Sequence, residues 1–154
     1  MTTKLTRHFT LEELTRSATA ERLGLANWPT ADDLRRLRDT ADMLQRIRDT
    51  LGSAVVVTSG YRAPAVNKAV GGVTSSDHAR GQAADIVVPG YGTPYQVAKA
   101  LAPLVSVLGI GQLILEGVKG KQWVHVCTRP PHKSVNRILT ITDAGARSGI
   151  HSLT

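Results

Sequence analysis

Two short stretches of the chain carry side chains of the kind that bind a catalytic metal ion. The first runs from Ser76 to Asp85 and contains His78, and the second, Trp-Val-His-Val, contains His125. Two imidazoles and one carboxylate form the ligand set of a catalytic zinc site that keeps its fourth position open for water. If His78, Asp85 and His125 meet on one metal ion, we expect the chain to be a hydrolase.

The surroundings of Asp85 favour a metal-binding role. Asp85 lies in the apolar run 83–88, where an ionised carboxylate is costly to bury unless it is paired or bound to a metal. Gly81 lets the chain turn from a loop into this run, so that His78 and Asp85 can point to one spot. The residues alone leave two alternatives open, because Asp85 can pair with an arginine or cap a turn, and His78 can bind the backbone.

Length and composition indicate one globular domain over residues 1–154. The chain has 42% hydrophobic and 20% charged residues, which is ordinary for a folded domain and excludes disorder as its main state. The single cysteine, Cys127, excludes an internal disulfide framework and a cysteine-rich structural zinc site. We interpret Cys127 as a small buried apolar residue.

Charge and hydropathy restrict the partners and the location. The net charge of +7 suits a polyanionic partner, such as nucleic acid, anionic lipid or the acidic bacterial cell wall. The basic residues are scattered, with no lysine or arginine run longer than two, so we expect no specific nucleic-acid site. We find neither the apolar core of a secretory signal nor an apolar stretch of about 18 residues. We therefore expect a chain that is made in a cytoplasm and has no membrane span.

The apolar patterns predict an α+β fold, with a small and mostly antiparallel sheet preceded by helices. A helical part covers about 8–51, a core that carries the metal site covers about 54–128, and a tail covers 129–154. Thr10 and Glu13 form the signature of a capping box. Apolar residues at spacings of three and four predict a long helix that starts near Thr30 and ends at Gly52. Further short helices are expected from Pro64 to Val70 and from Thr93 onward, and strands at 54–58, 83–88, 112–115, 123–128 and 138–142, the last as an edge strand.

Three motifs together resemble a known family. They are Ser-Gly-Tyr-Arg ending at Arg62, the Ser-x-His-x-x-Gly-x-Ala-x-Asp block from Ser76 to Asp85, and Trp-x-His ending at His125. In order and spacing they resemble the zinc D-Ala-D-Ala carboxypeptidases, a family that includes phage L-Ala-D-Glu endopeptidases and shares the fold of the hedgehog signalling domain. The resemblance covers roughly residues 8–128, including an opening Phe-Thr-Leu-Glu-Glu-Leu that is similar to phage members.

The resemblance implies a role for each matching position. His78, Asp85 and His125 would bind one zinc ion. Arg62 would hold the scissile carbonyl or stabilise the oxyanion, a task that suits a planar donor with a permanent charge. Ser76 would hydrogen-bond the substrate. The alternatives are a surface salt bridge for Arg62 and loop capping for Ser76.

One position departs from the family. Many members carry an acidic general base three residues before the last histidine ligand, where this chain has Gln122. We predict that Glu116 replaces it. A two-residue turn at Gly120-Lys121 would place Glu116 directly across from His125, whereas a register change of one residue would turn it to the other face.

The function expected from this resemblance is zinc-dependent hydrolysis of a peptide bond in bacterial peptidoglycan, of the D-Ala-D-Ala carboxypeptidase or the L-Ala-D-Glu endopeptidase type. The setting would be phage or prophage lysis by a monomer. Such an enzyme is held in the host cytoplasm until it is released onto the wall, or it is virion-associated. Two alternatives remain: a zinc-bearing but non-catalytic module that binds cell-wall peptide or protein, favoured by Gln122, and a nucleic-acid-binding protein that uses its arginine-rich helix.

Overall fold

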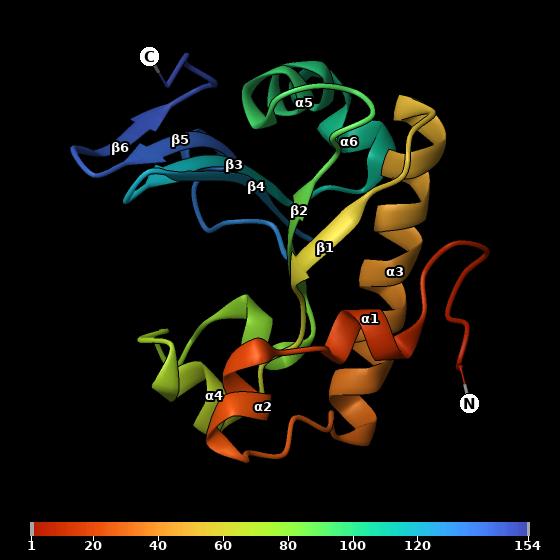
Figure 1. Cartoon of the computed structure of the whole chain (residues 1–154). Helices are drawn as coiled ribbons and strands as arrows, with labels where there is room; N and C mark the ends of the chain where they lie inside the picture. Colours follow the sequence, from red (N-terminus) through yellow and green to blue (C-terminus); the bar gives the residue numbers. More distant parts are fainter. Residues whose placement is uncertain (1, 154) are drawn as a thin grey trace.

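The chain folds around one six-stranded sheet (Figure 1). A computed structural model describes residues 2–153. The strands lie in the order β1-β2-β4-β3-β5-β6. Their bounds are Val56–Ser59 (β1), Ala83–Val87 (β2), Gln112–Val118 (β3), Lys121–Cys127 (β4), Ile138–Thr142 (β5) and Gly145–Ser148 (β6). All neighbouring strands are antiparallel except β3 and β5, which are parallel. The prediction of an α+β fold with a mostly antiparallel sheet is confirmed.

Helices lie on both sides of this sheet. The α-helices are Leu11–Thr15 (α1), Ala18–Leu23 (α2), Ala31–Leu51 (α3), Pro64–Ala69 (α4), Pro94–Leu101 (α5) and Val105–Leu108 (α6). Three 3₁₀ helices cover Asp77–Arg80 (η1), Ala102–Leu104 (η2) and Ser134–Asn136 (η3). In Figure 1, α5 and α6 lie above the sheet, α2 and α4 lie below it, and the long α3 runs along one side. No helix of the described chain is both long and apolar enough to cross a membrane.

Local sequence signals explain the ends of the N-terminal helices. In α1 the Thr10 hydroxyl accepts from the Glu13 amide and the Glu13 carboxylate accepts from the Thr10 amide, so the predicted capping box is confirmed. In α3 the Thr30 hydroxyl accepts from the Asp33 amide, and Gly52 ends the helix in the left-handed region, as predicted. The short helix α2 was not predicted.

The two faces of the sheet serve different purposes. On one face Leu113, Leu115, Val124 and Val126 are fully buried in a core shared with α3 and α5. Burial of such a side chain stabilises the fold by about 1.5–3 kcal/mol. Because successive side chains point to opposite faces, the residues between them, including His125, point to the other side. The second face is therefore free to carry polar groups.

The β3–β4 hairpin differs from the prediction in its register. Its turn is Lys119-Gly120, with φ values of 52° and 77°, and Glu116 pairs with Trp123 instead of His125. Two central residues with positive φ match the twist of the hairpin strands. The Asp143 carboxylate, from the β5–β6 turn, accepts hydrogen bonds from the Lys119 amide at 3.2 and 3.3 Å. This long-range contact supports a turn that the local sequence does not indicate.

The tail is more ordered than expected. Residues 138–142 form β5, as predicted, but this strand is not an edge strand because β6 pairs with it on its outer side. On its inner side β5 pairs with β3, so that Ile141 lies beside Glu116 and Leu139 beside Ile114. The tail thus extends the sheet that carries the candidate site.

Candidate metal centre

The three predicted metal ligands meet at one point although they come from different elements. His78 lies in η1, Asp85 in β2 and His125 in β4, and Asp85 stands directly opposite His125 in the β2–β4 pair. One Asp85 carboxylate oxygen, Oδ1, lies 2.9 Å from His125 Nδ1 and 3.4 Å from His78 Nε2. The candidate ligand atoms of the three residues all lie within 4.8 Å of one another.

The cluster fits a zinc ion. Tetrahedral zinc with bonds of about 2.0–2.1 Å to nitrogen and oxygen holds its ligand atoms about 3.3 Å apart. The separations around Asp85 Oδ1, 2.9 and 3.4 Å, lie on either side of this value. Two imidazoles and a carboxylate also supply the donor types of a catalytic zinc site with an open fourth position.

The backbone around His78 fixes the ring in a ligating orientation. His78 Nδ1 lies 2.8 Å from the Gly60 carbonyl, which can only accept, so we assign the proton to Nδ1 and the free lone pair to Nε2. Nε2 is the atom that faces Asp85. A side chain at Gly60 would collide with Leu14, because its Cβ would lie 2.3 Å from the Leu14 carbonyl oxygen. Glycine at position 60 therefore lets the backbone pass close to Leu14 and present the Gly60 carbonyl to His78.

The Asp85 carboxylate and the His125 imidazole change the pKa values of each other. Burial by itself raises the pKa of Asp85, but hydrogen bonds to His125 and His78 lower it well below its usual range. For His125 the effect of burial is the opposite, since it lowers the pKa of the imidazole. The hydrogen bond to Asp85 outweighs this effect and raises the pKa of His125. A proton and a metal ion thus compete for the same lone pairs, and metal binding releases protons.

Arg62 lies at the margin of this cluster. Its Nε donates to the Ser59 hydroxyl at 3.1 Å, and its Nη2 lies 3.5 Å from Asp85 Oδ2. Burial lowers the pKa of Arg62, while Asp85 and Glu116 raise it, and an arginine stays charged throughout. The side chain is 19% exposed, so the contact with Asp85 is a half-buried one and not a surface salt bridge.

Glu116 also belongs to this neighbourhood. Burial raises the pKa of Glu116, the charge of Asp85 adds to the increase, and His125, Trp123 and Arg62 oppose it. Glu116 pairs with Trp123, and Trp123 lies two residues before His125 on the same strand, so the three side chains share one face. The predicted base therefore lies on the face of the ligands, diagonal to His125.

Three other polar residues that the sequence places near the site have different surroundings. Gln122 precedes Trp123 directly, so its side chain points to the opposite face of the strand. Asp77, the acidic residue next to His78, forms an ion pair with Arg129 at 2.7 Å. Ser76 caps η1, because its hydroxyl accepts from the His78 amide at 3.3 Å. This matches the capping alternative for Ser76 and leaves its hydroxyl proton free to donate.

Residues that the sequence did not single out hold the Arg62 segment in place. Asn27 donates from Nδ2 to the carbonyls of Thr15 and Tyr61, at 2.7 and 3.0 Å, and accepts from the Ala63 amide at 2.7 Å. Asn27 contacts residues more than thirty positions away, and no local pattern predicts such bonds. The Tyr61 side chain is buried, and its hydroxyl donates to Asp33 at 3.2 Å.

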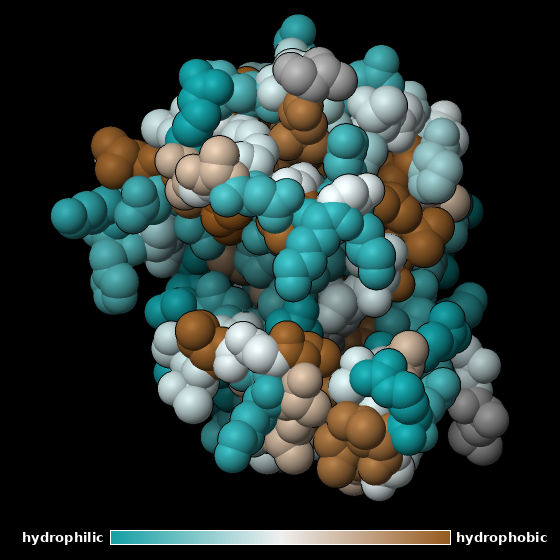
Figure 2. Space-filling model, turned by 60° about the vertical axis from the view of Figure 1, so that its left-hand side comes forward, coloured by the Kyte–Doolittle hydropathy of each residue, from teal (hydrophilic) through white to brown (hydrophobic). Residues whose placement is uncertain are grey.

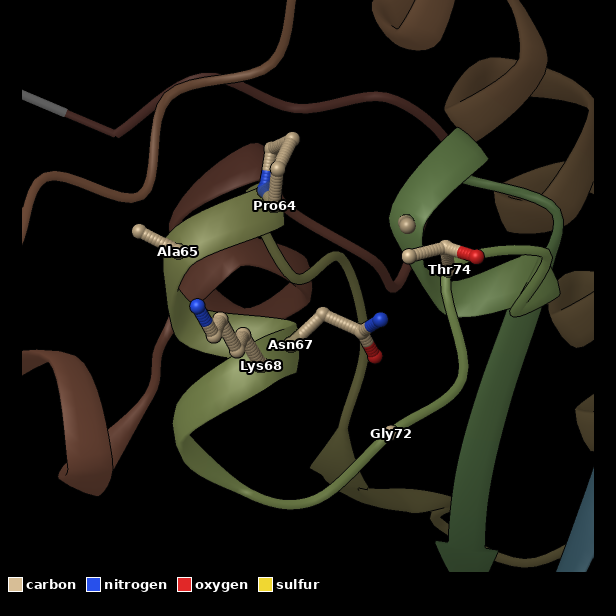
Figure 3. Close-up of a pocket in the computed structure, with 7 residues that line it drawn as sticks. Pro64, Ala65, Asn67, Lys68, Gly72 and Thr74 are labelled. Atoms are coloured by element: carbon tan, nitrogen blue, oxygen red, sulfur yellow. The ribbon is translucent and has the colours of Figure 1, made fainter.

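The surface is hollowed between the two parts of the molecule. Figure 2 shows an indentation between an upper part, which contains β3–β6, and a lower part, which contains α2 and α4, with hydrophilic side chains at its floor. A mainly apolar pocket of about 520 Å³ lies between α4 and the loop before η1, with Pro64 and Lys68 on one side and Thr74 on the other (Figure 3). The metal-binding residues do not line this pocket, but Ala79, next to His78 in the chain, does.

Comparison with known proteins places this geometry in a family. A search of curated proteins finds no match. Residues 7–126 match the family model described as Peptidase M15, and this region contains His78, Asp85, His125, Arg62 and Glu116. The match covers most of the chain and includes the whole cluster, so the chain belongs to the peptidase M15 family and is a zinc metallopeptidase.

Proposed function

We propose that this peptidase cleaves a peptide bond of bacterial peptidoglycan, as a D-Ala-D-Ala carboxypeptidase or an L-Ala-D-Glu endopeptidase. The observation that carries the proposal is the convergence of His78, Asp85 and His125. Arg62 forms an ion pair with Asp85, and the charges of Asp85, His125 and Arg62 act on the pKa of Glu116. The family resemblance implies a role for the three ligands and for Arg62, and the position of Glu116 on the ligand face of the hairpin supports its role as the base.

The roles of the side chains follow from their chemistry. His78, Asp85 and His125 would hold a zinc ion, which would supply Lewis-acid polarisation of a carbonyl and acidification of water. Glu116 takes a proton from the attacking water and passes it to the leaving amine. Burial, with the charge of Asp85 adding to it, raises the pKa of Glu116, which makes its carboxylate a stronger base than an exposed glutamate.

Two further groups bind the substrate. Arg62 donates to the carbonyl oxygen as negative charge develops on it, and its bond to Ser59 fixes the plane of the guanidinium beforehand. The Ser76 hydroxyl accepts from the His78 amide and donates its proton to a substrate carbonyl. Both contacts orient the peptide relative to the ligands.

The substrate class rests on charge and on the resemblance. A net charge of +7 without a long basic run suits a polyanionic surface more than a defined nucleic-acid site. The cell wall offers such a surface together with peptides that contain D-amino acids. The opening Phe-Thr-Leu-Glu-Glu-Leu, similar to phage members, supports a role in phage or prophage lysis. We place the enzyme in the host cytoplasm before release onto the wall, or on the virion, as a monomer with one peptidase domain over residues 1–154.

One observation favours a second candidate function. Gln122 occupies the position at which many relatives carry their base, and glutamine cannot accept a proton. If Glu116 did not replace it, the chain would be a zinc-bearing module that binds wall peptide without cleaving it.

Product analysis separates the two functions. Zinc-loaded protein is incubated with purified peptidoglycan, and the released peptides are identified by mass spectrometry, with a chelator control and zinc add-back. We expect chelator-sensitive peptides whose masses name the cleaved bond. Zinc-replete protein that binds the wall and releases no peptide would support the binding module.

A further inference from the structure

Trp123 carries a buried hydrogen-bond donor without a partner. Among the buried side-chain atoms of the described residues, its Nε1 is one of three that make no hydrogen bond of normal geometry. A buried N–H that stays unpaired costs about 1–3 kcal/mol. Such a group is expected to have a function or a partner that a small side-chain movement brings into range.

The residue that faces Trp123 across the hairpin is Glu116, whose carboxylate is a hydrogen-bond acceptor. Trp123 and Glu116 stand directly opposite each other in the β3–β4 pair, where Cβ atoms are about 4.5–5.5 Å apart. The indole already acts on this carboxylate, because it lowers the pKa of Glu116 against the effect of burial. We expect a rotation of the Glu116 side chain to complete the bond.

Other groups around Glu116 leave this role to Trp123. Gly117 separates Glu116 from the turn and has no side chain, and Ile141, beside Glu116 on β5, is apolar. Arg62 is also engaged with Ser59 and Asp85. A substrate is a poor alternative partner for the indole, because Nε1 is shielded from solvent while Glu116 remains partly exposed.

We propose that the Trp123 indole N–H binds one carboxylate oxygen of Glu116 and holds the other oxygen toward Asp85 and His125, which makes Trp123 a positioning residue for the base. This inference rests on the proposed function of Glu116. A glutamate side chain with three free torsions samples many orientations, and a rigid donor on the facing strand selects one of them. Misplacement of a reacting group by about 1 Å can lower a rate 10²-fold.

Nuclear magnetic resonance of the indole N–H groups tests the contact without reference to activity. The chain has two tryptophans, and Trp28 is 76% exposed, so Trp28→Phe assigns the two indole signals and leaves Trp123 as the reporter. We expect the Trp123 signal to move upfield in Glu116→Gln, because a bond to a charged acceptor is stronger than one to a neutral acceptor. The Trp28 signal is the internal control and should stay in place.

Steady-state kinetics test the consequence. Trp123→Phe keeps a ring and removes the N–H, and we expect kcat to fall about tenfold or more with KM changed less than about twofold and zinc content unchanged. In the Glu116→Gln background the same substitution should lower the residual rate less than about twofold. A purely structural role for Trp123 would lower the rate equally in both backgrounds.

The outcomes distinguish this inference from the proposed function. A Trp123 indole signal that does not respond to Glu116→Gln overturns the positioning contact even if the enzyme cleaves peptidoglycan. An indole signal that responds, in a protein whose Glu116→Gln variant is fully active, shows that the contact exists but that Glu116 is not the base, and this also overturns the inference. Coupled losses in kcat together with the spectral change support it.

Discussion

Glu116 lies directly across the β3–β4 hairpin from Trp123, two residues away from the predicted partner His125. A shift of two residues keeps a side chain on its face of the sheet, whereas a shift of one reverses it. The predicted base is therefore on the side of the ligands although its predicted partner is wrong. Gln122, at the position where many family members carry their base, points to the opposite face from the ligands.

Glu116→Gln should abolish most of the peptidase activity and leave zinc binding intact. General base catalysis contributes about 10²–10⁴-fold, so we expect a loss of this size in kcat. Released peptides are measured by mass spectrometry and zinc by elemental analysis. Gln122→Ala is the matched control on the adjoining strand, and its activity should stay within about twofold of the original. If Gln122→Ala were as damaging as Glu116→Gln, the roles assigned to the two faces of β4 would be wrong.

His78→Ala should remove the zinc ion, which we expect at one per chain. Bound zinc at a hundred times its dissociation constant stabilises the fold by about 2.7 kcal/mol, and both a chelator and His78→Ala should remove this contribution. Thermal unfolding with and without zinc measures the effect. His132→Ala, at an exposed position, is the control and should retain the zinc-dependent increase in Tm. Equal zinc content in the two variants would exclude His78 as a ligand.

Gly81→Ala should destabilise the protein more than Gly120→Ala. Both glycines have a φ of 77°, so both substitutions carry the left-handed strain of about 1–2 kcal/mol. A Cβ at Gly81 would also lie 2.6 Å from the Asp33 carbonyl oxygen, whereas Gly120 has nothing within 4 Å. We expect an additional loss of about 1–3 kcal/mol at Gly81. Urea unfolding of the two variants measures the difference.

The same pair of variants should differ in zinc affinity. Gly81 ends η1, which carries His78, so a shift of this turn moves a ligand, while Gly120 lies in the distant hairpin turn. Competition with a chromophoric chelator measures the affinity. Equal affinities would show that η1 tolerates the added methyl group without moving His78.

Tyr61→Phe should change the alkaline limb of the stability profile. Burial and the neighbouring Asp33 raise the pKa of Tyr61 to about 12, against about 10 in the unfolded chain. The neutral phenol therefore contributes its full stability below about pH 10, and this contribution is lost as the pH rises through about 12. Without this phenol, the free energy of unfolding should fall less steeply over that range.

The effect of Tyr61→Phe is measured at pH 7 as a reference, and a substitution at a second tyrosine serves as a control. At pH 7 Tyr61→Phe should cost about 0.5–1.5 kcal/mol through the lost bond to Asp33. Tyr91→Phe, at an exposed position, provides the control for the loss of a tyrosine hydroxyl elsewhere in the chain. Parallel alkaline limbs in the original protein and Tyr61→Phe would contradict the raised pKa.

Prediction from sequence succeeds where short-range chemistry determines the outcome. The ends of α3 follow from Thr30 and Gly52, and its buried face follows from apolar spacing. The grouping of His78, Asp85 and His125 was inferred from the cost of burying a carboxylate and from motif spacing, and the structure brings these three side chains together.

Prediction fails where distant contacts decide. The turn of the β3–β4 hairpin is held by Asp143, whose carboxylate accepts a hydrogen bond from the amide of Lys119, 24 residues away. The support of the Arg62 segment depends on Asn27, whose partners Tyr61 and Ala63 are 34 and 36 residues away. Neither contact leaves a periodic or local signal.

The parallel pairing of β3 with β5 covers backbone groups of β3 that would otherwise form a sheet edge. The family match ends at residue 126, before β5 begins. A chain shortened to the matched region would leave one side of β3, a strand of seven residues, with unpaired amide and carbonyl groups. Such an edge recruits strands from other molecules. On this side of the sheet the outermost strand is β6, which is only four residues long and carries the positive charge of Arg147, two features that discourage intermolecular pairing.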